Sequence, residues 1–322
     1  MKRDALERNQ VWLYLAAVVA GLGAGSVAPG LAPSMELLLW PSLALLLYAT
    51  FTQVPLAHLP AAFRDMRFMS AVLVGNFLVL PVLVWGLTAF VPEDPAVQLG
   101  VLLVLLVPCT DWFITFAHQA GGDVRRAIVA TPVVLVIQIV LLPLYLWLFM
   151  GDGLAVRLSA GRMAAAFLSI IVVPLVLAGL TERWAEQSGV RGERLIQRLG
   201  ALPVPLLGFV VLLIAGSQVE AVLGSLDLFR GVLAPFVVFL AGAAVCGVVL
   251  GRAFSLPPDQ ARTLLFSFST RNSFVVLPLA LALPPGWEAA GLVIVFQSLI
   301  ELFGMLLFLW LVPRVLMPFR GT

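Results

Sequence analysis

The chain has 322 residues, of which 61% are hydrophobic and only 11% are charged, and its mean hydropathy is +1.08. Soluble domains carry roughly 25% charged residues, so this composition excludes a soluble domain. A formal net charge of +2 also gives no reason to expect nucleic acid as a partner. The chain is predicted to sit in a lipid bilayer.

Apolar runs of about 20 residues, which span a bilayer core of about 30 Å as helices, recur along the chain. No segment alternates apolar and polar residues as the strands of a membrane β-barrel do. We therefore expect an all-α polytopic membrane protein with ten transmembrane helices. The predicted spans are 11–31, 35–57, 68–91, 97–120, 127–150, 162–181, 199–218, 230–252, 260–284 and 289–312.

The first predicted span follows a basic N-terminus, as the apolar region of a secretory signal does. It is longer than the roughly 7–15 residues of such a region, so we expect it to be retained. If the N-terminus is cytoplasmic, the cytoplasmic segments hold 15 of the 19 Lys and Arg residues, and only Arg157, Arg162 and Arg230 lie outside. Basic residues concentrate in cytoplasmic loops. We expect a multi-pass protein of the cell (plasma) membrane with both termini cytoplasmic.

The fourth predicted span is interrupted by Pro108, Cys109, Thr110 and Asp111. Proline lacks an amide hydrogen and clashes with the preceding turn, so it opens the helix. The freed carbonyl groups and the positive end of the second half-helix then face one small volume. We expect the three residues after the proline to lie in that volume. The alternative is a simple kink, in which Cys109 packs as a small apolar residue.

The ninth predicted span has a polar cluster in its middle. The cluster consists of Ser267, Ser269, Thr270, Arg271, Asn272 and Ser273. Such side chains compete for backbone hydrogen bonds and can cap half-helices, which predicts a second break. A lone charge is costly inside a bilayer, so we expect Asp111 to be the charge partner of Arg271. The alternative is that Arg271 extends its long side chain to the membrane interface.

The two broken spans indicate an internal repeat. Each is followed by a long, nearly uncharged span, and these two spans share a local pattern in which Gln138 and Gln297 take the same place. A repeat of five spans enters the membrane from the opposite side in its second copy. We expect an inverted 5+5 repeat made of residues 1–160 and 161–322, with spans four and nine crossing at the site.

Glu301 is a further charge inside a span, four residues after Gln297 and so on the same helical face. Burial disfavours the charged form of a carboxylate, so Glu301 could load and release a proton, or bind a sodium ion. The alternative is a structural hydrogen bond to a neighbouring helix. The residues expected to support the site from around it are Pro108, Thr270, Gln297, Gln138 and Asn76.

Pro108-Cys109-Thr110, followed at the end of its span by Gly122-Asp123, resembles the fourth-span motif of the arsenite efflux permeases. These arsenical-resistance transporters belong to the bile acid/sodium symporter superfamily. The resemblance implies a ten-span inverted-repeat fold with panel and core domains, and arsenite efflux by antiport with protons that depends on Cys109 and Glu301. Asp111 and Arg271 depart from the family pattern, which leaves the substrate open.

Three functions are open at this point. In the first, the chain exports arsenite (or antimonite) in exchange for protons, and the substrate-binding residues are Cys109, Thr110, Asn272 and Ser273. In the second, it is a sodium-coupled transporter of an organic anion, which Arg271 binds. In the third, it is a membrane enzyme or a receptor that does not transport.

The third function has the least support, because the sequence has no zinc motif, nucleophile triad or phosphate loop. The two cysteines, Cys109 and Cys246, cannot build a multi-cysteine metal cluster or a disulfide framework. We therefore expect no enzyme, no metal and no cofactor. The expected partners are a small inorganic or organic solute, a coupling proton (or sodium ion) and the lipid bilayer, and the oligomeric state is open.

Overall fold

The computed structural model describes residues 3–54, 65–110, 112–150, 172–217, 219 and 224–318, and in this part of the chain the elements are helices, with no strand among them. The all-helical prediction is confirmed for these residues. The α-helices are α1 (Arg3–Val27), α2 (Ala32–Phe51), α4 (Met66–Val74), α5 (Leu80–Thr88), α6 (Pro95–Leu106), α7 (Trp112–Gln119), α8 (Val124–Met150), α11 (Val173–Gln187), α12 (Val190–Leu199), α13 (Pro203–Ser217), α15 (Leu226–Ala253), α16 (Pro258–Ser269), α17 (Ser273–Leu281) and α18 (Glu288–Leu311). A π-helical turn, Gly75–Val79, joins α4 to α5, and a second, Val312–Leu316, continues α18.

Within the described ranges, six helical stretches are long and apolar enough to cross a membrane. They are Pro29–Phe51, Met66–Thr88, Val124–Met150, Val190–Ser217, Leu226–Ala253 and Glu288–Leu316. Spans four and nine are each divided into two short helices, so their halves fall below this length. Much of the predicted span 162–181 lies outside the described residues. The count of ten therefore stays a prediction, whereas the multi-pass membrane character is confirmed.

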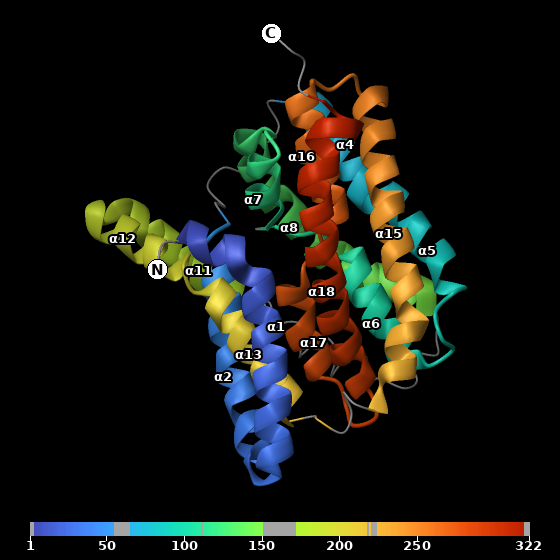
Figure 1. Ribbon diagram of the computed structural model, residues 1–322. Coiled ribbons are helices and arrows are strands. Elements are labelled where there is room, and N and C mark those ends of the chain that lie inside the picture. Colours follow the sequence, from blue (N-terminus) through green and yellow to red (C-terminus); the bar gives the residue numbers. More distant parts are fainter. Residues whose placement is uncertain are drawn as a thin grey trace.

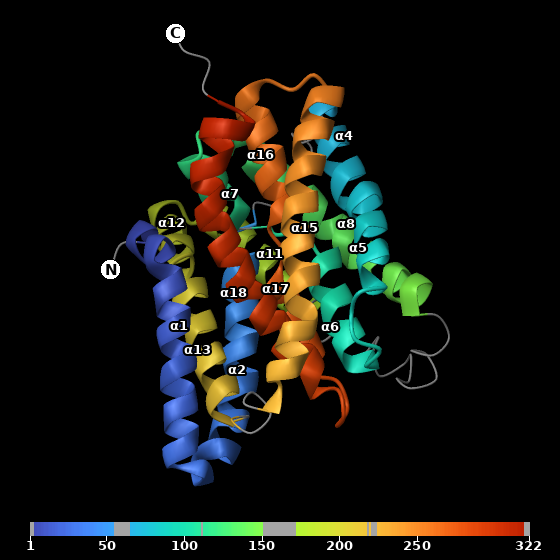
Figure 2. The same cartoon turned by 45° about the vertical axis from the view of Figure 1, so that its right-hand side comes forward.

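The helices form two groups (Figures 1 and 2). α13 packs against both α1 and α2, and the three helices lie side by side in both views. α4 to α8 and α15 to α18 make up the second group, in which α6 packs on α18 and α15 packs on α16. α17 contacts α2, and α18 contacts α1, so these two helices join the groups. The two short half-helix pairs lie within the second group.

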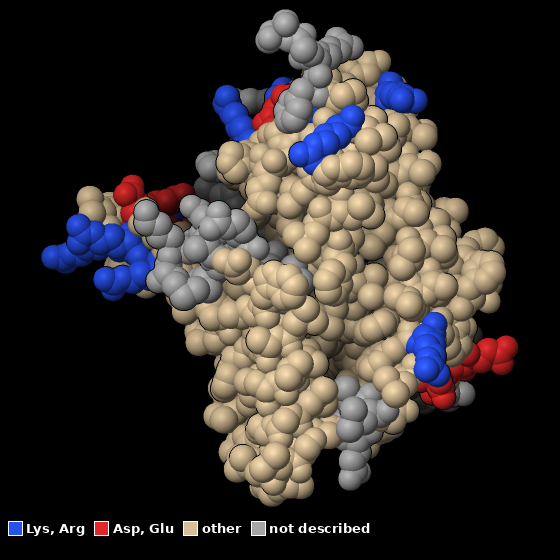
Figure 3. Space-filling view, in the orientation of Figure 1, with Lys and Arg blue, Asp and Glu red and all other residues tan. Residues whose placement is uncertain are grey.

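Charged side chains lie at the edges of the visible surface, and a broad uncharged belt separates them (Figure 3). Lys, Arg, Asp and Glu gather at the top, over the projecting α12 at the left, and at the lower right of the view. An uncharged belt suits the hydrocarbon core of a bilayer, where a charge is costly. The surface therefore agrees with the membrane class inferred from composition.

Two glycines of α1 allow its backbone to touch that of α13. A methyl group on Gly25 would lie 2.1 Å from the carbonyl oxygen of Gly216, and one on Gly21 would lie 2.3 Å from that of Leu212. Small residues four apart permit such close helix approach in membranes. A methyl group on Gly23, in the same helix, meets nothing within 4 Å.

Gly25→Ala is therefore expected to destabilise the protein by about 1–3 kcal/mol, because the obstructing atom is backbone and the helices must move apart. Gly23→Ala is the matched control and should leave stability unchanged. The melting temperatures of both variants, purified in detergent, check this. Equal melting temperatures would show that the α1–α13 contact does not depend on Gly25.

Candidate functional site

Two helix breaks lie at the centre of the site. α6 and α7 are separated by residues 107–111, and α16 and α17 are separated by residues 270–272. The backbone is extended at the end of each first half: Val107 has φ −107° and ψ 104°, and Thr270 has φ −107° and ψ 140°. Pro108 lies at the first break and cannot donate a helical hydrogen bond, although Pro132 and Pro143 lie inside the continuous α8. The second break coincides with the polar cluster and contains no proline.

The two breaks bond directly to each other. The backbone N–H of Cys109 donates to the carbonyl oxygen of Thr270 at 3.2 Å, and the N–H of Asn272 donates to that of Val107 at 2.8 Å. The pair forms a short antiparallel bridge between Pro108 and Arg271. Backbone groups freed by one break are thereby satisfied by the other, which a buried site in lipid requires. We call this contact the crossing, residues 107–110 and 270–273.

Side chains reinforce the crossing. Asn272 caps α17 by accepting a hydrogen bond from the N–H of Val275 at 3.3 Å, and its amide nitrogen donates to the hydroxyl oxygen of Thr110 at 3.1 Å. The hydroxyl of Ser298 on α18 donates to that of Ser273 at 2.7 Å. A capping side chain satisfies an N–H that the helix cannot pair itself. Three elements thus share one polar network.

Cys109 lies inside this network and is 2% exposed. Its sulfur is a thiol and is not part of a disulfide. It is followed by Thr110, which is 1% exposed. Cys109 and Thr110 are thus both buried at the first break, and their role in binding a substrate stays a prediction.

Arg271 is 2% exposed and does not reach an interface. Its Nη1 donates to the carbonyl oxygen of Leu105 at 3.2 Å. Its Nη2 lies 3.1 Å from the side-chain oxygen of Asn76, 3.1 Å from the carbonyl oxygen of Ser267 and 2.6 Å from that of Phe268. The ring of Phe239 lies 5.3 Å from the guanidinium carbon, within the range of a cation–π contact. Oxygen atoms and an aromatic face thus surround the charge.

The predicted ion pair between Asp111 and Arg271 cannot be judged from these contacts. Asp111 lies outside the residues that the structure describes. The pair therefore stays a prediction. The hydrogen-bond acceptors found around the guanidinium among the described residues are the carbonyl and amide oxygens above.

Glu301, on α18, is 1% exposed and contacts the second break. One carboxylate oxygen accepts a hydrogen bond from the backbone N–H of Arg271 at 2.9 Å and another from the side-chain amide of Gln297, also at 2.9 Å. The expected shared face of Gln297 and Glu301 is therefore present as a direct contact. Hydrogen bonds to an ionised carboxylate are stronger than those between neutral groups. Glu301 thus couples α18 to the crossing.

Asn76 and Gln138, both predicted as supporting residues, differ in their surroundings. Asn76, in the π-helical turn after α4, accepts from Arg271 and donates to the hydroxyl of Ser267 at 3.1 Å. Gln138, on α8, is 2% exposed, and neither polar atom of its amide has a hydrogen-bond partner among the described residues. The structure joins Asn76 to the crossing by hydrogen bonds and does not so join Gln138.

This difference predicts opposite effects on stability. Asn76→Leu is expected to destabilise by about 1.5–3 kcal/mol, because it removes an acceptor from a buried charged group. Gln138→Leu should leave the melting temperature unchanged or raise it, because it replaces an unsatisfied buried amide by an apolar group of similar size. Thermal unfolding in detergent checks both. Equal losses would contradict the assigned contacts.

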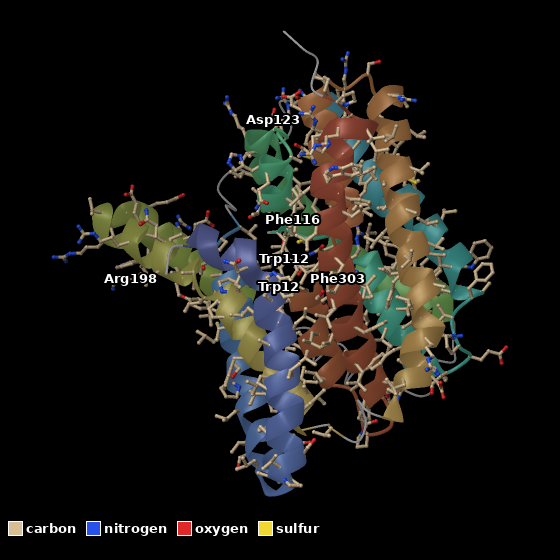
Figure 4. The ribbon with its side chains drawn as sticks, viewed as in Figure 1. Trp12, Trp112, Phe116, Asp123, Arg198 and Phe303 are labelled. Carbon is tan, nitrogen blue, oxygen red and sulfur yellow. The ribbon has the colours of Figure 1, made fainter. Side chains whose placement is uncertain are left out.

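Aromatic side chains cover the crossing on the side of α1. Trp112, at the start of α7, lies 6.0 Å from the ring of Tyr14 on α1 and 4.9 Å from that of Phe274 on α17, measured between ring centroids. Trp112 and Phe116 lie between the α1–α13 group and α18 near the middle of the view (Figure 4). These rings join α7, α1 and α17 next to the crossing. The sequence analysis did not single out these residues, nor Ser298.

Comparison with known families gives a match that covers more than half of the chain. The sequence model of the Sodium Bile acid symporter family matches residues 40–225. The matched range includes the first break and α8 and ends before the second break. A comparison with curated proteins finds no match.

Proposed function

The chain belongs to the Sodium Bile acid symporter family, and from this premise we propose that it exports arsenite (or antimonite) in exchange for protons. Members of this family are membrane transporters and not enzymes. The observation that carries the proposal is the buried thiol of Cys109 at the crossing, next in the chain to the buried Thr110. Membership of the family does not by itself identify the substrate or the coupling ion.

We propose arsenite as the substrate because the site combines one soft ligand, the thiol of Cys109, with hard hydroxyl and amide groups. Arsenous acid is uncharged near neutral pH, and its arsenic atom binds sulfur readily. Soft thiolate ligands select soft partners, whereas hydroxyl and amide groups serve the oxygen atoms of the solute. A single thiol supports transient binding, while three would hold arsenic too tightly for release. The thiol of Cys109 would replace one hydroxyl group of arsenous acid, whose As–O bond breaks as the As–S bond forms, and the thiol proton leaves with that hydroxyl as water. Hydrolysis of the As–S bond reverses the step for release, and the residues proposed to bind the remaining oxygen atoms are Thr110, Asn272 and Ser273.

The proposed coupling uses Glu301. As a carboxylate it holds the backbone of Arg271 and the amide of Gln297 through one oxygen. Protonation removes its negative charge and weakens both hydrogen bonds, since charge-assisted bonds are roughly twice as strong as neutral ones. The hold of Glu301 on the backbone of Arg271 would then weaken, while the hydrogen bond from Ser298 to Ser273 still joins α18 to the crossing. Uptake of a proton at Glu301 is thereby linked to a rearrangement at the substrate site.

The proposal includes the ten-span inverted repeat with both termini cytoplasmic. Its support is the matching order of elements: α6, a break, α7 and the long α8 in one half, and α16, a break, α17 and the long α18 in the other. Transporters built from inverted repeats bind their solutes where such broken helices meet. The excess of basic residues in the loops expected to be cytoplasmic supports the orientation.

A second candidate is sodium-coupled transport of an organic anion, and the name of the family favours it. In this function Arg271 would bind the carboxylate or sulfonate of the solute. The guanidinium is instead engaged by Asn76 and by carbonyl oxygens at the ends of α6 and α16. This engagement favours the first candidate. The second predicts that Cys109→Ser is tolerated and that transport requires sodium.

Everted membrane vesicles from a host without its own arsenite exporter test the proposal. Arsenite accumulation is measured under an imposed proton gradient, with sodium present or replaced by choline. We expect accumulation that depends on the gradient and is the same in both salts. Absence of accumulation would overturn arsenite export, and accumulation that needs sodium would favour sodium coupling.

A further inference from the structure

The guanidinium of Arg271 occupies a cage with more acceptor oxygens than one nitrogen can pair. Nη2 carries two N–H bonds, yet three oxygen atoms, from Asn76, Ser267 and Phe268, lie within 3.1 Å of it. A fourth oxygen, that of Leu105, accepts from Nη1. A guanidinium has five N–H donors and no acceptor, so it enters this cage only as a cation. We call these four oxygen atoms the oxygen cage.

The oxygen cage is built from the negative ends of two half-helices. Leu105 lies in the last turn of α6, and Ser267 and Phe268 lie in the last turn of α16. Carbonyl groups of a last helical turn lack an intrahelical donor. They also carry the negative end of the helix dipole, which favours a cation. The break in each span therefore leaves carbonyl oxygens free to accept from one guanidinium, with the Leu105 oxygen at Nη1 and those of Ser267 and Phe268 at Nη2.

Such an arrangement is chemically a site for a small cation. Hard cations take oxygen ligands from backbone carbonyls and side-chain amides. In membrane proteins, carbonyl oxygens replace the water shell of a permeating or coupling ion. In this protein, carbonyl and amide oxygens of the same kind surround the guanidinium of Arg271. Three of the four oxygens are backbone atoms, so the cage does not depend on its side chains alone.

We propose that Arg271 is a tethered cation, which fills through its own side chain a cation position that would otherwise take a free ion. The inference deepens the proposed function and rests on it in taking the crossing as the transport site. A fixed positive charge stabilises the ends of α6 and α16 at all times. The crossing then needs no sodium ion at this position, and only the proton on Glu301 changes during transport.

A cation site and an ordinary buried arginine differ in what happens when the arginine side chain is removed. If the cage has an intrinsic preference for a cation, removing the side chain leaves an oxygen-lined space that free sodium or guanidinium can enter. Arg262 is the matched comparison. It is 3% exposed, and two carbonyl oxygens, those of Met317 and Gly121, accept from its guanidinium near one end of the molecule. Arg262 is thus a second buried arginine that binds carbonyl oxygens, and it lies outside the crossing.

The test is thermal unfolding of Arg271→Ala, purified in detergent, in sodium, guanidinium or choline chloride at equal low concentration. We expect its melting temperature to be about 5 °C higher in sodium or guanidinium than in choline, because a bound ion stabilises the folded state. The wild type and Arg262→Ala should melt at the same temperature in all three salts.

Equal melting of Arg271→Ala in the three salts would overturn the inference, as would an equal ion response of Arg262→Ala. If Arg271→Ala is not recovered in choline, the yield of monodisperse protein becomes the readout. That yield should rise when sodium or guanidinium is present during solubilisation, and an equal loss in all three salts would overturn the inference. The measurement needs no transport, so a failure of arsenite export and a failure of the tethered cation give different results.

Discussion

Cys109→Ser is expected to reduce arsenite accumulation in everted vesicles to the level of vesicles that lack the protein. Serine is close to cysteine in size, so the crossing between the two breaks should persist. The hydroxyl cannot replace the sulfur as a soft ligand for arsenic. Accumulation under a proton gradient, normalised to the amount of folded protein, measures the effect.

Cys246→Ser is the control for this prediction. Cys246 lies on α15 and is only partly buried, and it is not part of the crossing. The control should transport arsenite like the wild type. If Cys109→Ser keeps wild-type accumulation, the thiol does not bind the substrate, and the sodium-coupled candidate gains support.

Glu301→Gln is expected to abolish accumulation driven by a proton gradient while exchange of arsenite for arsenite continues. The glutamine side chain keeps an oxygen that can accept from the backbone N–H of Arg271 and from Gln297. It does not take up and release a proton at physiological pH, so the link between proton and solute is lost. Counterflow of labelled arsenite, compared with accumulation under a gradient, separates the two activities.

Glu288→Gln provides the matched change. Glu288 lies in the first turn of the same helix, where its carboxylate accepts from the exposed N–H of Gly286. This variant should accumulate arsenite as the wild type does. Gradient-driven accumulation by Glu301→Gln at the wild-type rate would place the proton carrier elsewhere.

The helical membrane class and the two breaks could be predicted because they depend on local chemistry. Apolar runs of membrane length have no other stable arrangement in lipid. Pro108 removes a helical hydrogen bond, and the polar cluster from Ser267 to Ser273 competes for backbone bonds. Proline alone does not decide a break here, since Pro132 and Pro235 lie inside continuous helices. The superfamily suggested by Pro108-Cys109-Thr110 is supported by the family match. The arsenite-exporting subfamily and the inverted repeat stay predictions.

The contacts of Arg271 could not be predicted, because they join residues far apart in the chain. Its guanidinium bonds Asn76 and Leu105, and its backbone N–H bonds Glu301. From its charge, Arg271 was expected to have a carboxylate partner, and the described contacts add three backbone carbonyl oxygens and one amide oxygen around its guanidinium. Two helix ends supply the carbonyl oxygens only after the chain has folded. The pairing of Arg271 with Asp111 stays a prediction, because Asp111 lies outside the described residues.

The most direct test of the central claim uses purified protein in liposomes, with proton movement and arsenite movement recorded together. The account predicts that arsenite added on one side drives proton movement in the opposite direction through the wild type. It also predicts no such movement through Cys109→Ser, and no change when sodium is replaced by choline. Arsenite movement without proton movement, or movement that requires sodium, would contradict it.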